Sequence, residues 1–247
     1  MMLHRLIILL AFVLLGDCAI AQNPTIMPDV DAELWSGARL RYKHSKHWRF
    51  KLQQQVRFSA TPAHFERTLT QLGAEFRFLE SLELGAGYRY LWVNREVGPG
   101  FERMRYRRFQ LSLGQGVNVG RVRLNWRMQW QQRRELLPET NRFVGDIRRY
   151  WRARARIGYN IPGWKLDPEV ATEILQRGLN PPRGQYTKYR LMLGTRYRIG
   201  KGQQLAVRYI YERERKVWNP KVAHIVSIQY RYTLKRKQAK SNTEANE

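Results

Sequence analysis

The sequence predicts an all-β protein, an antiparallel up-and-down transmembrane β-barrel of ten to twelve strands. Polar and apolar residues alternate without interruption from Arg121 to Gln131, and successive side chains of a strand point to opposite faces. The alternation returns roughly every 15 to 20 residues between residues 32 and 234, in segments much longer than the usual strand of about 5 or 6 residues. An export signal precedes these segments, which is typical of an outer-membrane barrel.

Residues 1–21 have the parts of a secretion signal: a short basic start, an apolar run from Leu6 to Leu15, and the small-residue ending Ala19-Ile20-Ala21. The apolar run is too short for a membrane-spanning helix, which needs about 20 residues. Cys18 raises the alternative of a lipoprotein signal, but Asp17 stands where such signals have a small residue. We therefore expect cleavage after Ala21, which leaves a chain without cysteine and excludes disulfides and thiol chemistry.

Alternation places the strands, in chain order, at residues 32–43, 47–58, 66–78, 81–93, 103–118, 121–134, 147–160, 164–175, 185–199, 203–215 and 221–234. The connections alternate between short turns, as at Val119-Gly120 and Gly200-Lys201-Gly202, and longer loops, as at residues 94–102 and 135–146. Short turns on one rim and long loops on the other are typical of bacterial outer-membrane barrels, whose short turns face the periplasm.

Eleven strands is an odd number, whereas closed antiparallel barrels of this class have an even one. Two interpretations stay open: a further strand within residues 22–31 makes twelve, or the first segment folds into the lumen and ten strands close the wall. We expect a signal peptide at 1–21, an N-terminal segment at 22–31, the barrel at 32–234 and a disordered basic and polar tail at 235–247.

The outward face of the predicted strands is apolar, and aromatic residues gather toward its ends, as an interfacial girdle requires. The predicted girdle consists of Tyr88, Tyr90, Trp92, Trp126, Trp130, Tyr189, Tyr197, Tyr230 and Tyr232. The opposite face carries a basic luminal wall of Arg121, Arg123, Arg127, Arg152, Arg154, Arg156, Arg190, Arg196, Arg198 and Arg208. Its predicted acidic partners are Asp167, Glu169, Glu173 and Glu212.

The formal net charge of +25 would suit a nucleic-acid-binding protein, but export and the placement of arginines on alternate strand positions argue against one. Ion pairs across a narrow, filled lumen favour a structural role. The surplus of arginine favours a porin-like barrel for small anionic solutes. The expected partners are outer-membrane lipids including lipopolysaccharide, the barrel-assembly machinery and such a solute, in the cell outer membrane, with no nucleic acid.

An outer-membrane lipid-modifying enzyme, an acyl hydrolase or transferase, is the alternative. It needs a serine and a histidine beside an acidic residue, and Ser59, His64 and Glu66 are the loop grouping that could supply them. The sequence lacks the His-Glu-x-x-His and P-loop motifs. We therefore expect a protein that is not an enzyme and has no catalytic residue, metal or cofactor.

Several short segments follow one another in a characteristic order: Glu33-Leu34-Trp35, Gln55-Val56-Arg57-Phe58, Gly87-Tyr88-Arg89-Tyr90, Arg107-Arg108-Phe109, Arg152 to Tyr159, Arg190 to Tyr197 and His224 to Tyr232. In these segments and their order, the sequence resembles the uncharacterised DUF2490 family of outer-membrane barrel proteins, found mostly in Bacteroidota. The resemblance implies an outer-membrane barrel of unknown function and brings no catalytic residues with it.

Overall fold

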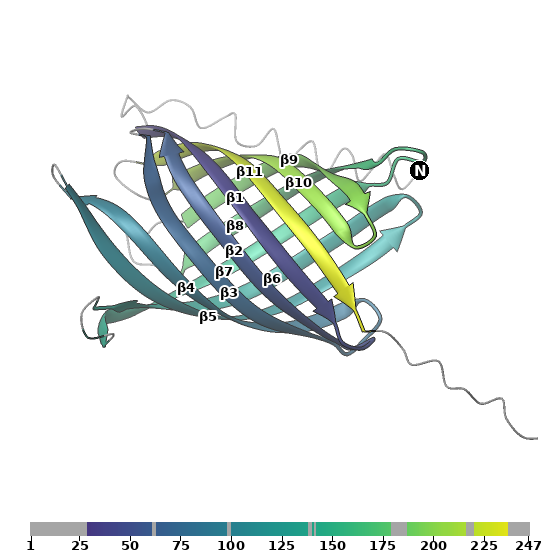
Figure 1. The fold of residues 1–247 in the computed structure, drawn as a ribbon, viewed down its shortest axis with the longest axis horizontal. Coiled ribbons are helices and arrows are strands. Elements are labelled where there is room, and N and C mark those ends of the chain that lie inside the picture. Colours follow the sequence, from purple (N-terminus) through teal and green to yellow (C-terminus); the bar gives the residue numbers. More distant parts are fainter. Residues whose placement is uncertain are drawn as a thin grey trace, which may run out of the picture.

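The computed structural model describes residues 29–60, 63–97, 100–137, 140, 142–178, 187–215 and 220–236. These form eleven strands and, within the described ranges, no helix (Figure 1). The strands are β1 (Asp29–Lys43), β2 (Trp48–Ala60), β3 (Ala63–Arg77), β4 (Leu82–Val97), β5 (Gly100–Val119), β6 (Val122–Leu136), β7 (Phe143–Tyr159), β8 (Leu166–Arg177), β9 (Thr187–Gly200), β10 (Gln203–Arg215) and β11 (Lys221–Lys235). The predicted all-β barrel is confirmed, and every predicted strand is present.

The strands close into one barrel in chain order, and each pairs antiparallel with its neighbour except at the seam. There β1 and β11 pair in parallel, in register from Asp29 with Lys221 to Lys43 with Lys235. Figure 1 shows the two strands side by side and pointing the same way. With an odd number of alternating strands the first and last run in the same direction, so only a parallel pair can close the wall.

Both interpretations of the odd strand number are therefore wrong. The first segment is neither joined by a twelfth strand nor folded into the lumen, because β1 lies in the wall between β11 and β2. The barrel begins at Asp29 instead of residue 32, and β11 ends at Lys235 instead of residue 234. The rest of the predicted N-terminal segment and the tail after residue 236 lie outside the described residues, as does the signal peptide.

The two rims differ, but the long loop predicted at residues 94–102 is mostly strand, because β4 continues to Val97 and β5 begins at Gly100. Turns of a few residues join the strands at one rim, and three contain a glycine with positive φ: Gly120 (58°), Gly163 (77°) and Gly202 (75°). At Gly202 a Cβ would also lie 2.5 Å from the carbonyl oxygen of Thr233. Longer strands project at the other rim, where the hairpin of β4 and the 20-residue β5 extends beyond its neighbours (Figure 1). We call these the short-turn rim and the long-loop rim.

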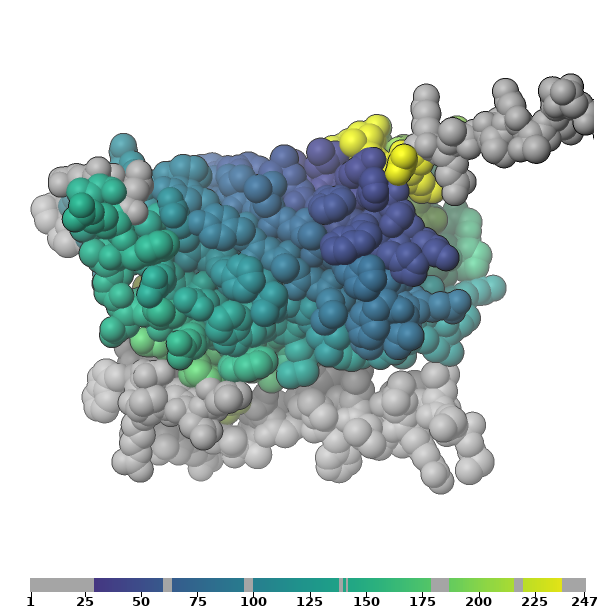
Figure 2. Space-filling model, turned by 90° about the horizontal axis from the view of Figure 1, so that it is seen from below, coloured from purple at the N-terminus to yellow at the C-terminus, as the bar shows by residue number. Residues whose placement is uncertain are grey.

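The outer face of the barrel is apolar and the inner face polar, the reverse of a soluble protein. Large exposed apolar residues occur on the outward register of every strand, including Leu34, Leu52, Leu72, Leu84, Leu111, Met128, Ile157, Ile174, Leu193, Val207 and Ile228. Figure 2 shows successive strands covering one side without a break in the wall. An apolar outside and a polar lumen are typical of a barrel surrounded by lipid. No helix of the described residues is long and apolar enough to cross a membrane.

Trp35 anchors the parallel seam from within the lumen. Its ring is 6% exposed and packs in a cluster with Met192, Ile210 and Ile225. The guanidinium carbon of Arg57 lies 3.7 Å from the ring centroid, a cation–π contact from the adjacent strand β2. Because a parallel pair is slightly less stable per residue than an antiparallel one, these contacts hold β1 in place.

We expect Trp35→Ala to lower the free energy of unfolding by about 3–5 kcal/mol, since a buried indole and its packing are lost at the seam. Urea unfolding of the refolded barrel, followed by far-UV circular dichroism, measures the change. The control is Trp164→Ala, because Trp164 is 63% exposed in a turn. Equal midpoints for the two variants would show that the seam does not depend on Trp35.

Candidate functional site: the arginine-rich lumen

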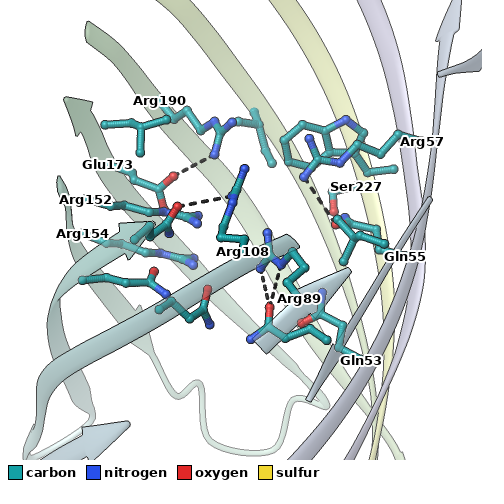
Figure 3. Close-up of a pocket in the computed structure, with 18 of the residues that line it drawn as sticks. Gln53, Gln55, Arg57, Arg89, Arg108, Arg152, Arg154, Glu173, Arg190 and Ser227 are labelled. Atoms are coloured by element: carbon teal, nitrogen blue, oxygen red, sulfur yellow. Dashed lines mark hydrogen bonds and ion pairs between the residues drawn. The ribbon is translucent and has the colours of Figure 1, made fainter. Parts of the chain in front are cut away.

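The lumen contains a cavity of about 210 Å³, and every strand from β1 to β11 contributes side chains to its wall (Figure 3). Its charged lining consists of Arg39, Arg57, Arg67, Arg89, Arg108, Arg127, Arg133, Arg152, Arg154, Glu173, Lys188, Arg190 and Arg208. Glutamines supply much of the remaining surface: Gln53, Gln55, Gln71, Gln110, Gln129, Gln131 and Gln229. Since a water occupies about 30 Å³ in the liquid, this space has room for several waters or one small solute.

One group of luminal ion pairs centres on Glu173 of β8, whose side chain is 1% exposed. Its two oxygens accept hydrogen bonds from Arg152 at 2.7 Å and from Arg190 at 2.8 Å. Arg190 also donates to Glu212 at 2.5 Å, and Lys188 approaches the same carboxylate at 2.7 Å. These charges alternate across β7 to β10, and the hydrogen bonds between them bind the strands to one another.

A second group centres on Glu169, which is 4% exposed. It accepts from Arg208 at 2.6 Å, pairs with Arg196 at 2.9 Å and lies 3.8 Å from Arg156. Gly194 stands opposite Arg208 in the ladder, and a Cβ there would lie 2.7 Å from Arg208 Cγ. The glycine therefore leaves the room in which the arginine lies flat against the wall and reaches Glu169.

The arginines on the other side of the lumen are held by glutamine amides. Arg39 donates to Gln53 Oε1 at 2.6 Å, and Arg89 donates from Nε to Gln71 Oε1 at 2.9 Å. Arg108 donates to Gln131 at 3.2 Å. Within the described residues, Arg39, Arg89 and Arg108 form no ion pair with a carboxylate. Their positive charge is thus solvated by amide dipoles but not neutralised.

The structure brings most of the predicted basic wall together. Arg127, Arg152, Arg154, Arg190 and Arg208 line the cavity. Arg156 and Arg196 surround Glu169 nearby, and Arg198 reaches Asp167 at 3.0 Å although its side chain is 51% exposed. The four predicted acidic partners Asp167, Glu169, Glu173 and Glu212 are all buried.

The two remaining predicted members of the wall lie at or near the short-turn rim. Arg121 lies in the turn before β6, which begins at Val122, so the prediction that Arg121 belongs to the luminal wall is wrong. The alternation continues into the turn, and the pattern alone therefore could not mark the end of the strand. Arg123 lies near the short-turn rim, where its Nε donates to Asn118 at 3.3 Å.

The predicted girdle residues lie on the outward register. Tyr88, Trp92, Trp126, Tyr197 and Tyr232 are exposed there, between 37% and 43%. Tyr90, Trp130, Tyr189 and Tyr230 are less exposed, since neighbouring side chains cover them. Tyr90, for example, packs against Trp92 with ring centroids 4.3 Å apart.

Several luminal residues were missing from the predicted wall, above all Arg39, Arg89 and Arg108 of β1, β4 and β5. The same alternation carries a signal for them: Arg89 stands between the outward Tyr88 and Tyr90, and Arg108 precedes the outward Phe109. The alternation of the strands therefore assigns more residues to the lumen than the predicted wall included.

In the suggested hydrolase grouping, Ser59 stands opposite His64 in the ladder of β2 and β3. The Ser59 hydroxyl lies 2.9 Å from both carboxylate oxygens of Asp31, the His64 ring packs on Phe101 at 5.1 Å, and Glu66 pairs with Arg67. Among the described residues, no group of three or more His, Cys, Asp or Glu could hold a metal ion.

The fold and the lumen define a class: a closed β-barrel with an apolar outside and an arginine-rich, partly hollow interior. The chain belongs to the DUF2490 family, described as "Protein of unknown function", whose profile matches residues 32–222. No curated protein matches the chain. Among solved structures, the β domain of the Bordetella autotransporter BrkA is 14% identical and aligns with a TM-score of 0.47, covering 73% of this chain and 81% of that one.

We expect Glu169→Gln to destabilise the barrel by about 3–5 kcal/mol, because it leaves the buried charges of Arg208 and Arg196 without a counter-charge. Urea unfolding measures the loss. The matched control is Glu80→Gln, which removes a carboxylate from an exposed turn and should leave stability unchanged within about 0.5 kcal/mol. A Glu169→Gln barrel as stable as the control would mean that the network does not support the wall.

Proposed function

We propose that the protein is an integral outer-membrane β-barrel whose lumen binds small anionic solutes or lets them pass. The observation that carries the proposal is the charge of the cavity wall: eleven arginines and one lysine line it, against the single carboxylate of Glu173. Cations lining a narrow passage raise the local concentration of anions and exclude other cations. A purely structural lumen would be expected to balance its charges more nearly.

The location in the outer membrane is supported by the secretion signal of the sequence and by the apolar outer face. In this orientation the long-loop rim faces outward and the short-turn rim faces the periplasm. Insertion would depend on the barrel-assembly machinery. The surrounding lipids would include lipopolysaccharide, whose phosphates the exposed arginines of the long-loop rim could bind.

The size of the cavity limits the solute. At about 210 Å³, and with long arginine side chains crossing it, the lumen suits a solute of the size of an inorganic oxyanion or a small organic acid. The role we propose is non-enzymatic, since the wall supplies fixed hydrogen-bond donors for an anion and the Ser59 hydroxyl is held by Asp31.

Reconstitution of the refolded chain in planar bilayers tests the proposal. We expect stepwise current whose reversal potential, in a salt gradient, shifts toward the equilibrium potential of the anion. A barrel that binds without conducting should instead unfold at a higher temperature in phosphate than in a sodium chloride solution of equal ionic strength, because a ligand of the native state stabilises it. Lys201→Gln, which removes an exposed charge from a turn of the short-turn rim outside the cavity, is the control.

Two results would contradict the proposal. One is a cation-selective current. The other is a folded barrel, shown by its heat-dependent mobility in gels, that neither conducts nor gains stability in phosphate.

A further inference from the structure

The register of the strands arranges the luminal side chains in rows that cross the wall from strand to strand. One row contains arginine and glutamine alone, and we call it the basic row. From β10 through the seam to β7 it consists of Gln204, Arg231, Arg39, Gln53, Gln71, Arg89, Arg108, Arg133 and Arg148, each directly opposite the next. The row thus contains six arginines, two before the glutamine pair Gln53 and Gln71 and four after it.

The basic row runs from one rim to the other, because the strands of a closed barrel are tilted and staggered. Gln204 is the second residue of β10, next to the short-turn rim. At the other end Arg133 lies close to the end of β6, and Arg148 close to the start of β7, at the long-loop rim. The middle of the row, from Arg39 to Arg133, lines the cavity. The row therefore extends along the length of the lumen, and six of its nine residues are positively charged.

Hydrogen bonds within the row orient its glutamines. Gln204 accepts from Arg231 at 3.3 Å, Gln53 from Arg39 at 2.6 Å and Gln71 from Arg89 at 2.9 Å, each through its amide oxygen. With their oxygens occupied by guanidinium groups, the glutamines present their NH₂ groups to the lumen. The row consequently offers hydrogen-bond donors almost exclusively, which suits a ligand that carries only acceptors.

Several arginines of the lumen have a buried donor without a partner within the described residues, among them Arg57, Arg133 and Arg152. Two further such donors lie together on the cavity side of the row. Arg89 and Arg108 stand opposite each other on β4 and β5 and extend into the pocket (Figure 3). Gln131, which is 1% exposed, accepts from Arg108 through its oxygen, while its own amide nitrogen has no partner within the described residues. The Nε of Arg108 is also buried there without a partner. A buried donor without an acceptor is costly, and an anion would satisfy both.

Another row has the opposite character. Arg154, Glu173, Arg190 and Glu212 stand opposite one another on β7 to β10, and their charges alternate in sign. Arg190 contacts both of its carboxylate neighbours. The four formal charges of this mixed row cancel, although the Nε of Arg154 is buried without a partner within the described residues. This part of the lumen is therefore more nearly neutral than the basic row.

We propose that the basic row is the path of oxyanions of the phosphate class through the lumen, and that Arg89, Arg108 and Gln131 form its principal binding site. The inference rests on the proposed function and adds the ligand class and the residues. Guanidinium groups donate two parallel hydrogen bonds to a phosphate or carboxylate and bind it more strongly than a halide, which has no such geometry. An oxyanion that leaves one arginine of the row can then bind the neighbouring arginine on either side.

The experiment measures phosphate affinity by the inhibition of chloride current through the reconstituted barrel, in the wild type and in Arg89→Gln and Arg108→Gln. Loss of a charged hydrogen bond is worth about 1.5–3 kcal/mol, so we expect each variant to weaken phosphate inhibition about tenfold or more. Arg89→Lys keeps the charge but not the paired donors, and we expect it to lose phosphate preference while keeping anion selectivity.

Arg196→Gln is the matched control. It removes one luminal charge, but that charge is neutralised by Glu169, which keeps Arg208 as a partner. We expect less than a twofold change in phosphate inhibition. Far-UV circular dichroism verifies that each variant is folded. If a barrel does not conduct, its thermal stabilisation by phosphate measures the affinity instead of the current.

The outcomes separate the two proposals. Equal effects of Arg89→Gln, Arg108→Gln and Arg196→Gln in an anion-selective barrel would overturn the basic row as the path and leave the proposed function intact. Phosphate inhibition of the chloride current no stronger than inhibition by bromide, another halide, would overturn the ligand class. A wild-type barrel that neither conducts nor binds anions would overturn the proposed function itself.

Discussion

Closure of the sheet is the constraint on which the rest of this structure depends. A strand in an apolar surrounding cannot leave its backbone N–H and C=O groups unpaired, so the wall must have no free edge. Eleven strands meet this requirement only through the parallel pair of β1 and β11. That pair fixes the position of Trp35, aligns Arg39 with Arg231 and makes the basic row continuous across the seam. The charge pattern of the lumen thus follows from how the wall closes.

The lumen combines two uses of arginine that differ in their partners. Around Glu169 and Glu173, arginines are neutralised by buried carboxylates and bind neighbouring strands together. Along the basic row, arginines are supported by glutamine oxygens, which hold the side chain in place without cancelling its charge. A basic composition alone would not distinguish the two. Which arginines are neutralised depends on which strands supply acidic residues. The carboxylates of the two ion-pair groups come from β8 and β10.

Much of the fold could be predicted from the sequence because alternation is a local property. The strand positions and the outward aromatic face follow from residues close together in the chain, such as Tyr88 to Trp92. The parallel seam and the basic row could not be predicted in this way. They depend on pairings between distant residues, such as Arg39 with Arg231, and a register shift of one strand changes all of them.

The seam also bears on how such a barrel can change size. Most of the wall consists of hairpins, and strands β2 and β11 run in opposite directions because only β1 lies between them. A chain shortened by β1 would bring β2 against β11, and this new pair would close an even-numbered wall in the antiparallel manner. The first strand β1 therefore enlarges the barrel by one strand. Its removal would also take Arg39 out of the basic row.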